Sequence, residues 1–511
     1  MSVRIALGGA AEEALGRVLT RLVDEKVASG VTAQDPTLWG ADAERDAARR
    51  LGWTEAVAAA RPLVPVVRGL REQLRRAGAR RVVLCSGGGA ARAAAAIAGS
   101  QGAGLTVLAT TDPTRVRTVL RDLGDATVVL AAPAGAPYDL DPHLRSVVQA
   151  YAEFGMDPAS RIVVVAEPGS ALASVAARAG LRTLDAEPLV GDRFSALSAA
   201  ALVPSALAGA DIAEVLDEAE SEELNLAIDD PSNNGLRLAA ALGGARRDVL
   251  AIVADGTHLV GFDAWAEQVL AGSGLVPVVL APDAPELTAA PDDLLVLRLV
   301  ADAHDARARA HVGRNEVLLS GSLGELLLVL EYATVLIARL LGADPFDDRL
   351  PPPPAAPAPP PAFAEDGVEV RLPDGATASD LRAAVDDLVA HAQQGRVVLH
   401  VSGDPRALPQ LAAIRAALAD RTRRPVPLAI GPAAATAARA PEAVLELATE
   451  PSDDVAVPGT SGTYGELTRI EAHSAVAAYT ARGSRVLALR LTTPEAADAV
   501  LAAATARKAR A

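Results

Sequence analysis

Residues 191–212, GDRFSALSAAALVPSALAGADI, join a short polar turn to an apolar stretch. The turn contains Asp192 and Arg193, and small apolar residues dominate the remainder of the segment. This composition predicts a short helix that is apolar on every side. Such a helix must be buried by its neighbours, so the strands around it determine the architecture.

Short apolar strands alternate with helices before and after this segment. The strand-like runs before it recur at intervals of roughly 20–35 residues. Those after it precede a long helix from about Leu323 to Leu341. Continuous apolar strands that alternate with helices are typical of parallel sheets covered on both faces. The runs are RVVLC (81–85), LTVLATTD (105–112), ATVVLAA (126–132), RIVVVAEPGS (161–170), RDVLAIVAD (247–255), LVPVVLAP (275–282) and LLVLRLVAD (294–302).

A proline-rich segment interrupts the later strands. PPPPAAPAPPPA, residues 351–362, cannot support a helix or a central strand, because proline lacks the backbone N–H group. Strand-like runs resume beyond it at RVVLHVSGD (396–404), RPVPLAIGP (424–432) and SRVLALRLTT (484–493). We therefore expect a linker at this point in the chain.

The segment at 191–212 resembles the glucose-6-phosphate isomerase family, whose members carry G-G-R-[FY]-S before an apolar helix with L-V-P-x-A-L-A-G. QDPTLWG (34–40) with LGW (51–53), and residues 325–347 and 454–492, resemble in the same order other parts of the longer, actinobacterial-type members. The resemblance implies an α/β fold with two SIS-type (sugar isomerase) three-layer α/β/α sandwich domains and mainly parallel sheets. The expected parts are a helical region at 1–80, a first SIS-like domain at 81–235, a second at 236–350, a Pro-rich linker at 351–364 and an α/β part at 365–511 that completes the second domain.

The family isomerises a sugar phosphate, and this reaction has three requirements. Hydroxyl and backbone N–H groups must hold the phosphate. A carboxylate must move a proton between two carbon atoms. A histidine or lysine must open the sugar ring while other groups stabilise the developing oxyanion.

The turn after the first strand, CSGGGA at 85–90, resembles the family's G-x-G-G-S loop. Gly87 and Gly88 leave the backbone open to a ligand, and Ser86 adds a hydroxyl group, so we expect these residues to bind substrate. The alternative is a tight strand-to-helix turn without a ligand, because a short glycine loop alone is weak evidence.

The family's phosphate-binding run, similar to S-S-K-S-G-S-T, is replaced here by AAPAGAP at 131–137. Only Gly135 remains of the pattern, and it is a further candidate for substrate binding. Hydrogen bonds to charged groups contribute roughly 1.5–3 kcal/mol each, and proline removes backbone donors. The loop therefore predicts weak phosphate binding.

The position of the family's catalytic glutamate falls on Gly272 within FDAWAEQVLAGSGLVPVVL, residues 262–280. Glu267 is the nearest carboxylate and the candidate base; the alternative is a solvated or capping acid. Arg193 is a candidate for contact with a sugar, and the alternative is an ion pair with Asp192 or a helix-capping role.

The family's lysine position falls on Ala355, and its motif with histidine and lysine reads GPAAATAARAPEAV at 431–444. The chain has 7 histidines, and none matches a site motif or has the spacing of a zinc-binding helix. We therefore expect no metal site and no cofactor.

Composition excludes several classes of partner. A net charge of −16 opposes binding to nucleic acid or to anionic lipid. No run approaches the ~20 apolar residues of a membrane span, and acidic residues near the start argue against a signal peptide. We expect a cytoplasmic protein.

The changes fall on site positions, whereas the apolar pattern of the scaffold persists. The leading hypothesis is a catalytically impaired homologue with a binding or structural role, as a homodimer or with a partner protein. One alternative is an active glucose-6-phosphate isomerase with a rearranged site that uses Glu267, Arg193 and the Ser86 loop. Another is a sugar-binding protein for an unphosphorylated or altered ligand. The expected small-molecule partner is a sugar phosphate or an altered small ligand.

Overall fold

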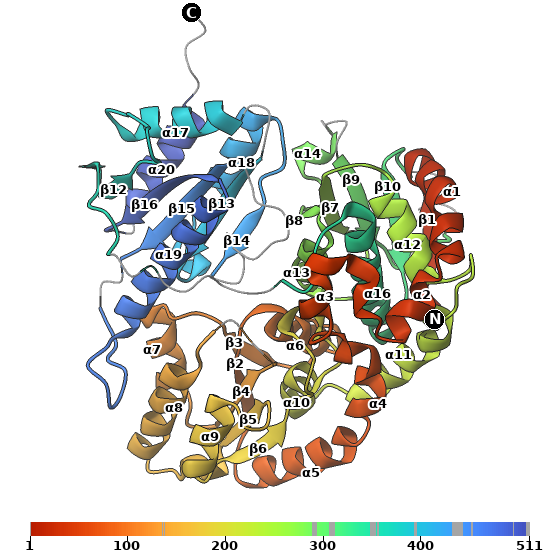
Figure 1. Cartoon of the computed structure of the whole chain (residues 1–511). Helices are drawn as coiled ribbons and strands as arrows, with labels where there is room; N and C mark the ends of the chain where they lie inside the picture. Colours follow the sequence, from red (N-terminus) through yellow and green to blue (C-terminus); the bar gives the residue numbers. More distant parts are fainter. Residues whose placement is uncertain are drawn as a thin grey trace, which may run out of the picture. The chain divides into compact units, whose positions relative to one another are not determined.

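The computed structural model has two compact units (Figure 1). The first comprises residues 1–109, 122–283 and 292–348, and the second comprises residues 110–121, 284–291 and 349–511. The structure describes residues 2–134, 136, 138–288, 294–305, 312–347, 354, 357–392, 396–431, 443–450, 453–493 and 495–506.

The first unit contains two sheets, one of which is wholly parallel. Its strands are β2 (Arg81–Cys85), β3 (Leu105–Leu108), β4 (Ala126–Ala132), β5 (Ile162–Ala166) and β6 (Arg182–Asp185), in the order β3-β2-β4-β5-β6. Strands β4 and β5 are buried along almost their whole length, which requires cover on both faces. Helix α10 (Ala199–Ala208) packs against β2 to β5, and α9 (Ala171–Arg178) packs against β5 and β6 (Figure 1).

The second sheet of this unit is parallel except at one edge. Its strands are β1 (Arg4–Leu7), β7 (Val249–Ala254), β8 (Val276–Val279), β9 (Leu294–Leu299) and β10 (Glu316–Ser320), in the order β1-β10-β9-β7-β8. Strand β1 runs antiparallel to β10. The sequence analysis expected only helix over residues 1–80, and β1 differs from that expectation because four residues are too few to show a periodicity.

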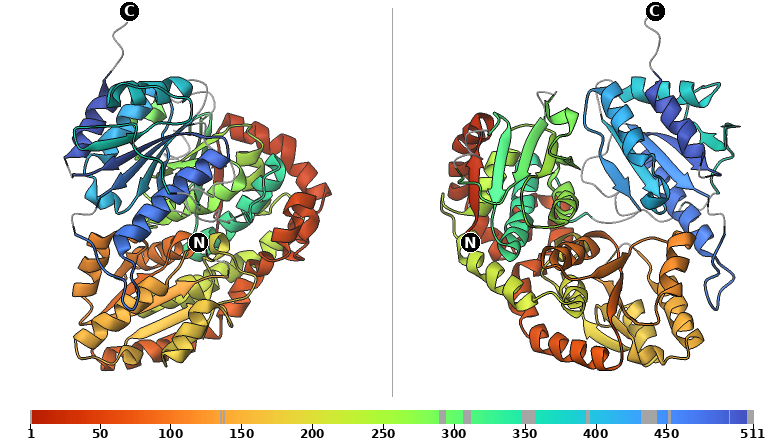
Figure 2. Two further views of the ribbon diagram at one scale, coloured as in Figure 1. Left: turned by 60° about the vertical axis from the view of Figure 1, so that its left-hand side comes forward. Right: turned by 180° about the vertical axis from the view of Figure 1, so that it is seen from behind.

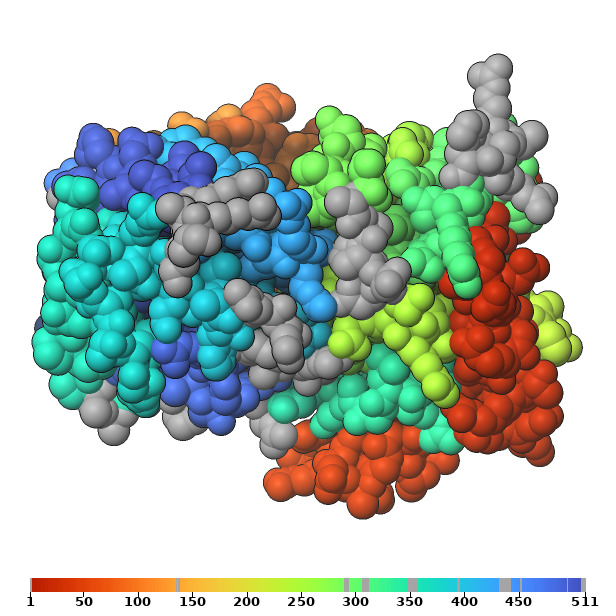
Figure 3. Space-filling model, turned by 90° about the horizontal axis from the view of Figure 1, so that it is seen from above, coloured from red at the N-terminus to blue at the C-terminus, as the bar shows by residue number. Residues whose placement is uncertain are grey.

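One apolar core joins the two sheets of the first unit. The helix predicted within residues 191–212 is confirmed as α10, whose side chains are almost all buried. Helix α1 (Gly9–Asp24) packs along β1, β10 and α12 (Asn234–Gly243), as the red and green ribbons of Figure 2 show. The outer face of α1 is open to solvent (red in Figure 3). The other helices of this unit are α2 (Val27–Thr32), α3 (Ala41–Ala47), α4 (Ala56–Ala60), α5 (Leu63–Arg76), α6 (Gly88–Ser100), α8 (Asp141–Glu153), α11 (Ile212–Ala227), α13 (Phe262–Leu270) and α16 (Leu323–Leu341).

The second unit contains one mixed sheet with its own core. Its strands are β11 (Phe363–Glu365), β12 (Val368–Arg371), β13 (Val397–Ser402), β14 (Leu428–Ile430), β15 (Ala443–Thr449) and β16 (Arg485–Leu491), in the order β11-β12-β16-β15-β13-β14. Strands β16, β15, β13 and β14 are parallel, and β12 is antiparallel to β16. The helices of this unit are α7 (Pro113–Arg121), α14 (Pro285–Thr288), α17 (Leu381–His391), α18 (Leu411–Thr422), α19 (Tyr464–Ala481) and α20 (Ala496–Thr505).

The sequence analysis expected residues 365–511 to complete the second domain. Within the described part of the chain, their strands instead join the short strand β11 in a separate sheet, over a separate core. A strand-like run carries no information about which sheet it joins. Residues 357–361 of the proline-rich segment form neither helix nor strand. The remaining domain boundaries stay predictions.

Helix α16 approaches α11 closely at a glycine. A Cβ atom at Gly324 would lie 2.0 Å from the carbonyl oxygen of Val215. The N–H group of Gly324 also donates to Glu218 Oε2 at 2.8 Å. The contact therefore has no room for any side chain.

Replacement of this glycine tests the packing of the two helices. We expect Gly324→Ala to lower the free energy of unfolding by about 1–3 kcal/mol, because the added methyl group must push the two backbones apart. The matched control is Gly16→Ala in α1, where a Cβ atom would meet nothing within 4 Å. That change should raise stability by about 0.5–1 kcal/mol. Urea unfolding measures both, and equal effects would contradict the packing described.

Candidate functional site

The start of α6 is occupied by a carboxylate of the protein itself. Strand β2 leads through Ser86 and Gly87 into this helix. The first N–H groups of α6 have no partner within the helix. Asp192, which is 3% exposed, accepts from the N–H of Gly89 through Oδ2 at 2.8 Å and from that of Ala90 through Oδ1 at 3.3 Å. A helix start is an anion site, and here Asp192 supplies the anion.

Two glycines of this turn are required by the approach of Asp192. Gly88 has a φ of +57°, and a Cβ atom there would lie 1.8 Å from Asp192 Oδ2. A Cβ atom at Gly89 would lie 2.3 Å from the backbone oxygen of Asp192. The glycine run is therefore accounted for by a contact within the protein.

Tyr138 covers the same turn from the loop after β4. Its hydroxyl lies 3.1 Å from Ser86 Oγ and 3.4 Å from Asp192 Oδ1, and a Cβ atom at Gly87 would lie 3.0 Å from its ring. Ser86 Oγ also donates to the carbonyl of Ala131 at 2.8 Å. Burial of the hydroxyl group and the Asp192 carboxylate raise the pKa of Tyr138 well above its ordinary value. Tyr138 could not be predicted from the sequence, because it is 52 residues from Ser86 in sequence and only the structure brings the two hydroxyl groups together.

Arg193 fills the space beside Gly272. Its side chain is 4% exposed, and Nη1 donates to the carbonyl of Gln268 at 2.9 Å, near the end of α13. A Cβ atom at Gly272 would lie 2.6 Å from Arg193 Cδ. The place where the resemblance puts a catalytic glutamate is therefore taken by the arginine side chain.

Glu267 links three elements of the first unit. Its Oε1 accepts from the N–H of Val279 in β8 at 3.2 Å, and Oε2 lies 3.6 Å from Nη1 of Arg92 in α6. Arg92 Nη1 also donates to the carbonyl of Ala264 in α13 at 3.0 Å. These contacts hold α13 against β8 and α6. The role of Glu267 as a base stays a prediction.

The structure brings Ser86, Gly87 and Gly88 together with Asp192 and Tyr138, and it places Arg193 beside α13. Gly135 lies outside the described residues, as does Ala355.

No group of three or more His, Cys, Asp and Glu side chains in the described part of the chain could hold a metal ion. Among the same residues, no helix is long and apolar enough to cross a membrane.

Two carboxylates, the buried Glu331 and the partly buried Glu187, hold the segment that carries Asp192. Glu331 Oε1, in α16, accepts from the N–H of Ala196 at 3.2 Å, and Glu187 accepts from the N–H of Ala199 at the start of α10 at 3.0 Å. Ser195 Oγ donates to the backbone oxygen of Asp192 at 2.7 Å. Burial raises the pKa of Glu331 to about 8. The segment is thus held by Glu331 of α16 and by Glu187, which lies in the loop after β6.

Aromatic contacts join three of the segments that carry the family resemblance. The ring of Phe194 stacks on that of Trp53 with centroids 5.4 Å apart, and it lies 5.7 Å from that of Phe346. Phe346 in turn meets Trp39 edge to face at 4.8 Å. The resembling motifs therefore meet in the core beside the candidate site.

No family model matches the chain. A probable glucose-6-phosphate isomerase of Haloarcula marismortui is 33% identical over 172 residues, which are 33% of this chain and 39% of that relative. The match thus spans less than half of the relative's length.

Solved structures share the fold. A hypothetical protein from Thermus thermophilus has a TM-score of 0.51 and 20% identity over 67% of this chain and 96% of its own. A glucose-6-phosphate isomerase from Chlamydia trachomatis has a TM-score of 0.51 and 17% identity over 66% of this chain and 82% of its own.

The expected fold class is confirmed: the chain has a mainly parallel α/β fold, which the Chlamydia trachomatis structure shares. Within that class, the curated relative and the matching motifs make it similar to glucose-6-phosphate isomerases, as the resemblance implied.

Removal of the Asp192 carboxylate tests its place at the helix start. We expect Asp192→Ala to lower the free energy of unfolding by about 1–3 kcal/mol, because two buried N–H groups lose a charged acceptor. The matched control is Asp211→Ala, which removes an exposed cap that accepts from Ala213 and Glu214 at the start of α11. Urea unfolding should give the smaller loss for the control, and an Asp192→Ala cost no greater than the control's would contradict the assignment.

The buried Glu331 carboxyl predicts a pH dependence of stability. The folded protein keeps its proton up to a pH of about 8, whereas the unfolded chain loses it near its ordinary pKa of 4.5. The contribution of Glu331 to stability therefore falls as the pH rises through this window. Urea unfolding from pH 4.5 to 8 should show the wild type losing stability relative to Glu331→Gln, and parallel profiles would refute the prediction.

Proposed function

We propose that the chain is a catalytically impaired homologue of glucose-6-phosphate isomerases that has a binding or structural role. The observation that carries this proposal is the pair of hydrogen bonds from Gly89 and Ala90 to the Asp192 carboxylate. These donors would otherwise be available to an anionic ligand.

Charge supports the proposal. A phosphate placed at the start of α6 would face Asp192, which is buried and already accepts both N–H groups. Like charges about 4 Å apart repel by roughly 4 kcal/mol at the effective dielectric constant of a protein surface. The phosphate would have to displace the carboxylate before it could bind there.

The residue at the position of the family's catalytic glutamate, Gly272, supports the proposal as well. Gly272 provides no carboxylate, and the Arg193 side chain lies where a longer residue would extend. Loss of a general acid or base lowers a rate by about 10²–10⁴. Glu267 is held by Val279 and Arg92, so its carboxylate already serves the packing of α13.

The core contrasts with the site. The aromatic contacts of Trp53, Phe194 and Phe346 are present, so the scaffold is still built although the groups needed for chemistry are replaced. We infer that the fold is still needed although isomerisation is not. The proposed role is that of a cytoplasmic homodimer or of a subunit beside a partner protein, with a sugar phosphate or an altered small ligand as the candidate small molecule.

The test is a coupled assay for conversion of glucose 6-phosphate to fructose 6-phosphate with the purified full chain. We expect no turnover above the blank from folded protein. Turnover near the ~1–10³ s⁻¹ of typical enzymes would overturn the proposal. If that activity collapsed in Glu267→Ala, the alternative of an active isomerase with a rearranged site would replace it.

A matched control separates chemistry from packing. Like Glu267, Glu316 forms an ion pair and accepts from a backbone N–H group: it pairs with Arg298 at 2.7 Å and accepts from Gly313 at 2.8 Å. Glu316 lies in β10 and not at the candidate site. In an active protein, Glu316→Ala should keep the activity while Glu267→Ala loses it. An equal loss in both variants would assign the effect to the scaffold.

A further inference from the structure

The sheet of the second unit has one apolar and one polar face. On the apolar face, Leu445, Leu447, Leu487 and Leu489 belong to the core formed with α17, α18 and α20. The opposite face is covered by α19, whose Ala478 and Tyr479 pack on Val444 and Val486. Side chains alternate along a strand, so this face also carries the polar residues His400, Ser402, Glu446 and Arg490.

Polar residues in the middle of a parallel sheet are unusual, because such strands are normally apolar on both faces. Glu446 is 2% exposed and His400 is fully buried. Their atoms Glu446 Oε1 and His400 Nε2 have no hydrogen-bond partner among the residues that the structure describes. A buried polar atom without a partner is costly, so its presence needs an explanation.

A pocket of about 530 Å³ opens on this polar face, within the second unit. Ala448 and Ala488 leave room between the strands and α19, and Glu446 lies in the pocket wall. Arg371, Arg469, Arg485 and Arg490 also line it, with the exposed Asp374 and with His391 and His473. The volume is within the range of sites for small molecules.

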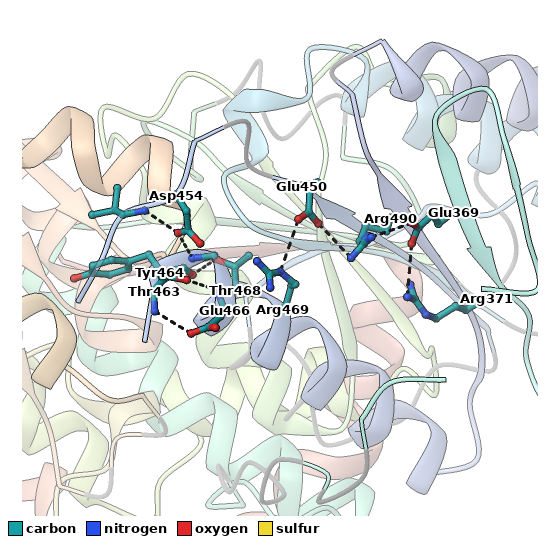
Figure 4. A network of polar contacts seen from close by, with 12 residues as sticks. Glu369, Arg371, Glu450, Asp454, Thr463, Tyr464, Glu466, Thr468, Arg469 and Arg490 are labelled. Atoms are coloured by element: carbon teal, nitrogen blue, oxygen red, sulfur yellow. Dashed lines mark hydrogen bonds and ion pairs between the residues drawn. The ribbon is translucent and has the colours of Figure 1, made fainter. Parts of the chain in front are cut away.

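Arginines outnumber carboxylates in the wall of the pocket. Figure 4 shows Arg490 between two acids: Nη2 lies 2.9 Å from Glu369 Oε1, and Nη1 lies 3.3 Å from Glu450 Oε2. Arg371 pairs with the same Glu369 at 3.7 Å, and Arg469 with the same Glu450 at 3.8 Å (Figure 4). Within this network three guanidinium groups share two carboxylates, which leaves one positive charge in excess before the exposed Asp374 of the wall is counted.

Of the other groups of the wall, Asp374 is exposed to solvent, Glu446 is buried and Arg485 is paired. Burial raises the pKa of Glu446 to about 8. His400, which lies on the same face of the sheet but not in the wall of the pocket, has its pKa lowered by burial to about 4. Arg485 pairs with Asp387 at 2.7 Å. A neutral carboxyl group can donate to, or accept from, a hydroxyl group.

We propose that this pocket binds a small hydroxylated organic anion, with Arg490 and its neighbouring arginines facing the carboxylate or phosphate and Glu446 facing a hydroxyl group. Guanidinium groups recognise both kinds of anion by paired hydrogen bonds. All residues of the pocket belong to the second unit, so the site does not depend on Asp192 or on the proposed loss of isomerase activity.

Isothermal titration of the full chain tests this site with three probes: gluconate, glycerol 3-phosphate and inorganic phosphate. We expect saturable binding of gluconate or glycerol 3-phosphate that weakens at least tenfold in Arg490→Gln and in Ala488→Leu, which fills the pocket. If gluconate binds more tightly, the acidic group of the ligand is a carboxylate; if glycerol 3-phosphate binds more tightly, it is a phosphate. Equal affinity for inorganic phosphate would overturn the assignment of a hydroxyl contact.

Two control variants keep the test specific. Arg298 in the first unit also bridges two acids, Asp255 at 2.9 Å and Glu316 at 2.7 Å. Binding should be unchanged in Arg298→Gln and in Asp192→Ala. Three results would overturn the proposal: the folded wild type does not bind, Arg490→Gln and Ala488→Leu bind as tightly as the wild type, or either control variant loses binding. Urea unfolding of each variant confirms that the protein compared is folded.

Discussion

The Asp192 carboxylate at the start of α6 is the interaction on which the candidate site depends. A helix start combines unpaired N–H groups with a partial positive charge, and both are satisfied here from within the chain. Gly88 and Gly89 have no room for a side chain because Asp192 lies against them. Tyr138 closes over the same carboxylate and over Ser86. The residues that resemble a ligand loop are thus arranged around an anion that the protein provides.

The scaffold around this contact explains why the family resemblance survives. Phe194 follows Asp192 and Arg193 directly, and its ring packs between Trp53 and Phe346. The same turn is fixed by Glu331 through the N–H of Ala196. Any change that loosens these contacts would disturb the core as well as the turn. The motifs are therefore constrained by packing, and their presence does not by itself indicate catalysis.

The sequence predicted the fold more fully than the site. Apolar strands and the helix at 199–208 were predictable because burial on both faces leaves a continuous apolar pattern. Strand β1 and the separate sheet of the second unit were not, because strand pairing depends on contacts distant in sequence. At the site, the replacement of the second family glycine by Asp192 was visible, but its hydrogen bonds to Gly89 and Ala90 were not. Tyr138, the contact of Arg193 with Gln268 and the contacts of Glu267 also required the structure.

Amide hydrogen exchange at Gly89 and Ala90 shows whether Asp192 or a ligand occupies the start of α6. The wild-type chain would be compared without ligand and with a large molar excess of fructose 6-phosphate. The account predicts the same protection of both amides in the two samples, because Asp192 already accepts from them. Slower exchange at Gly89 and Ala90 in the presence of the sugar phosphate would show that a ligand takes over the start of α6, and it would contradict the account.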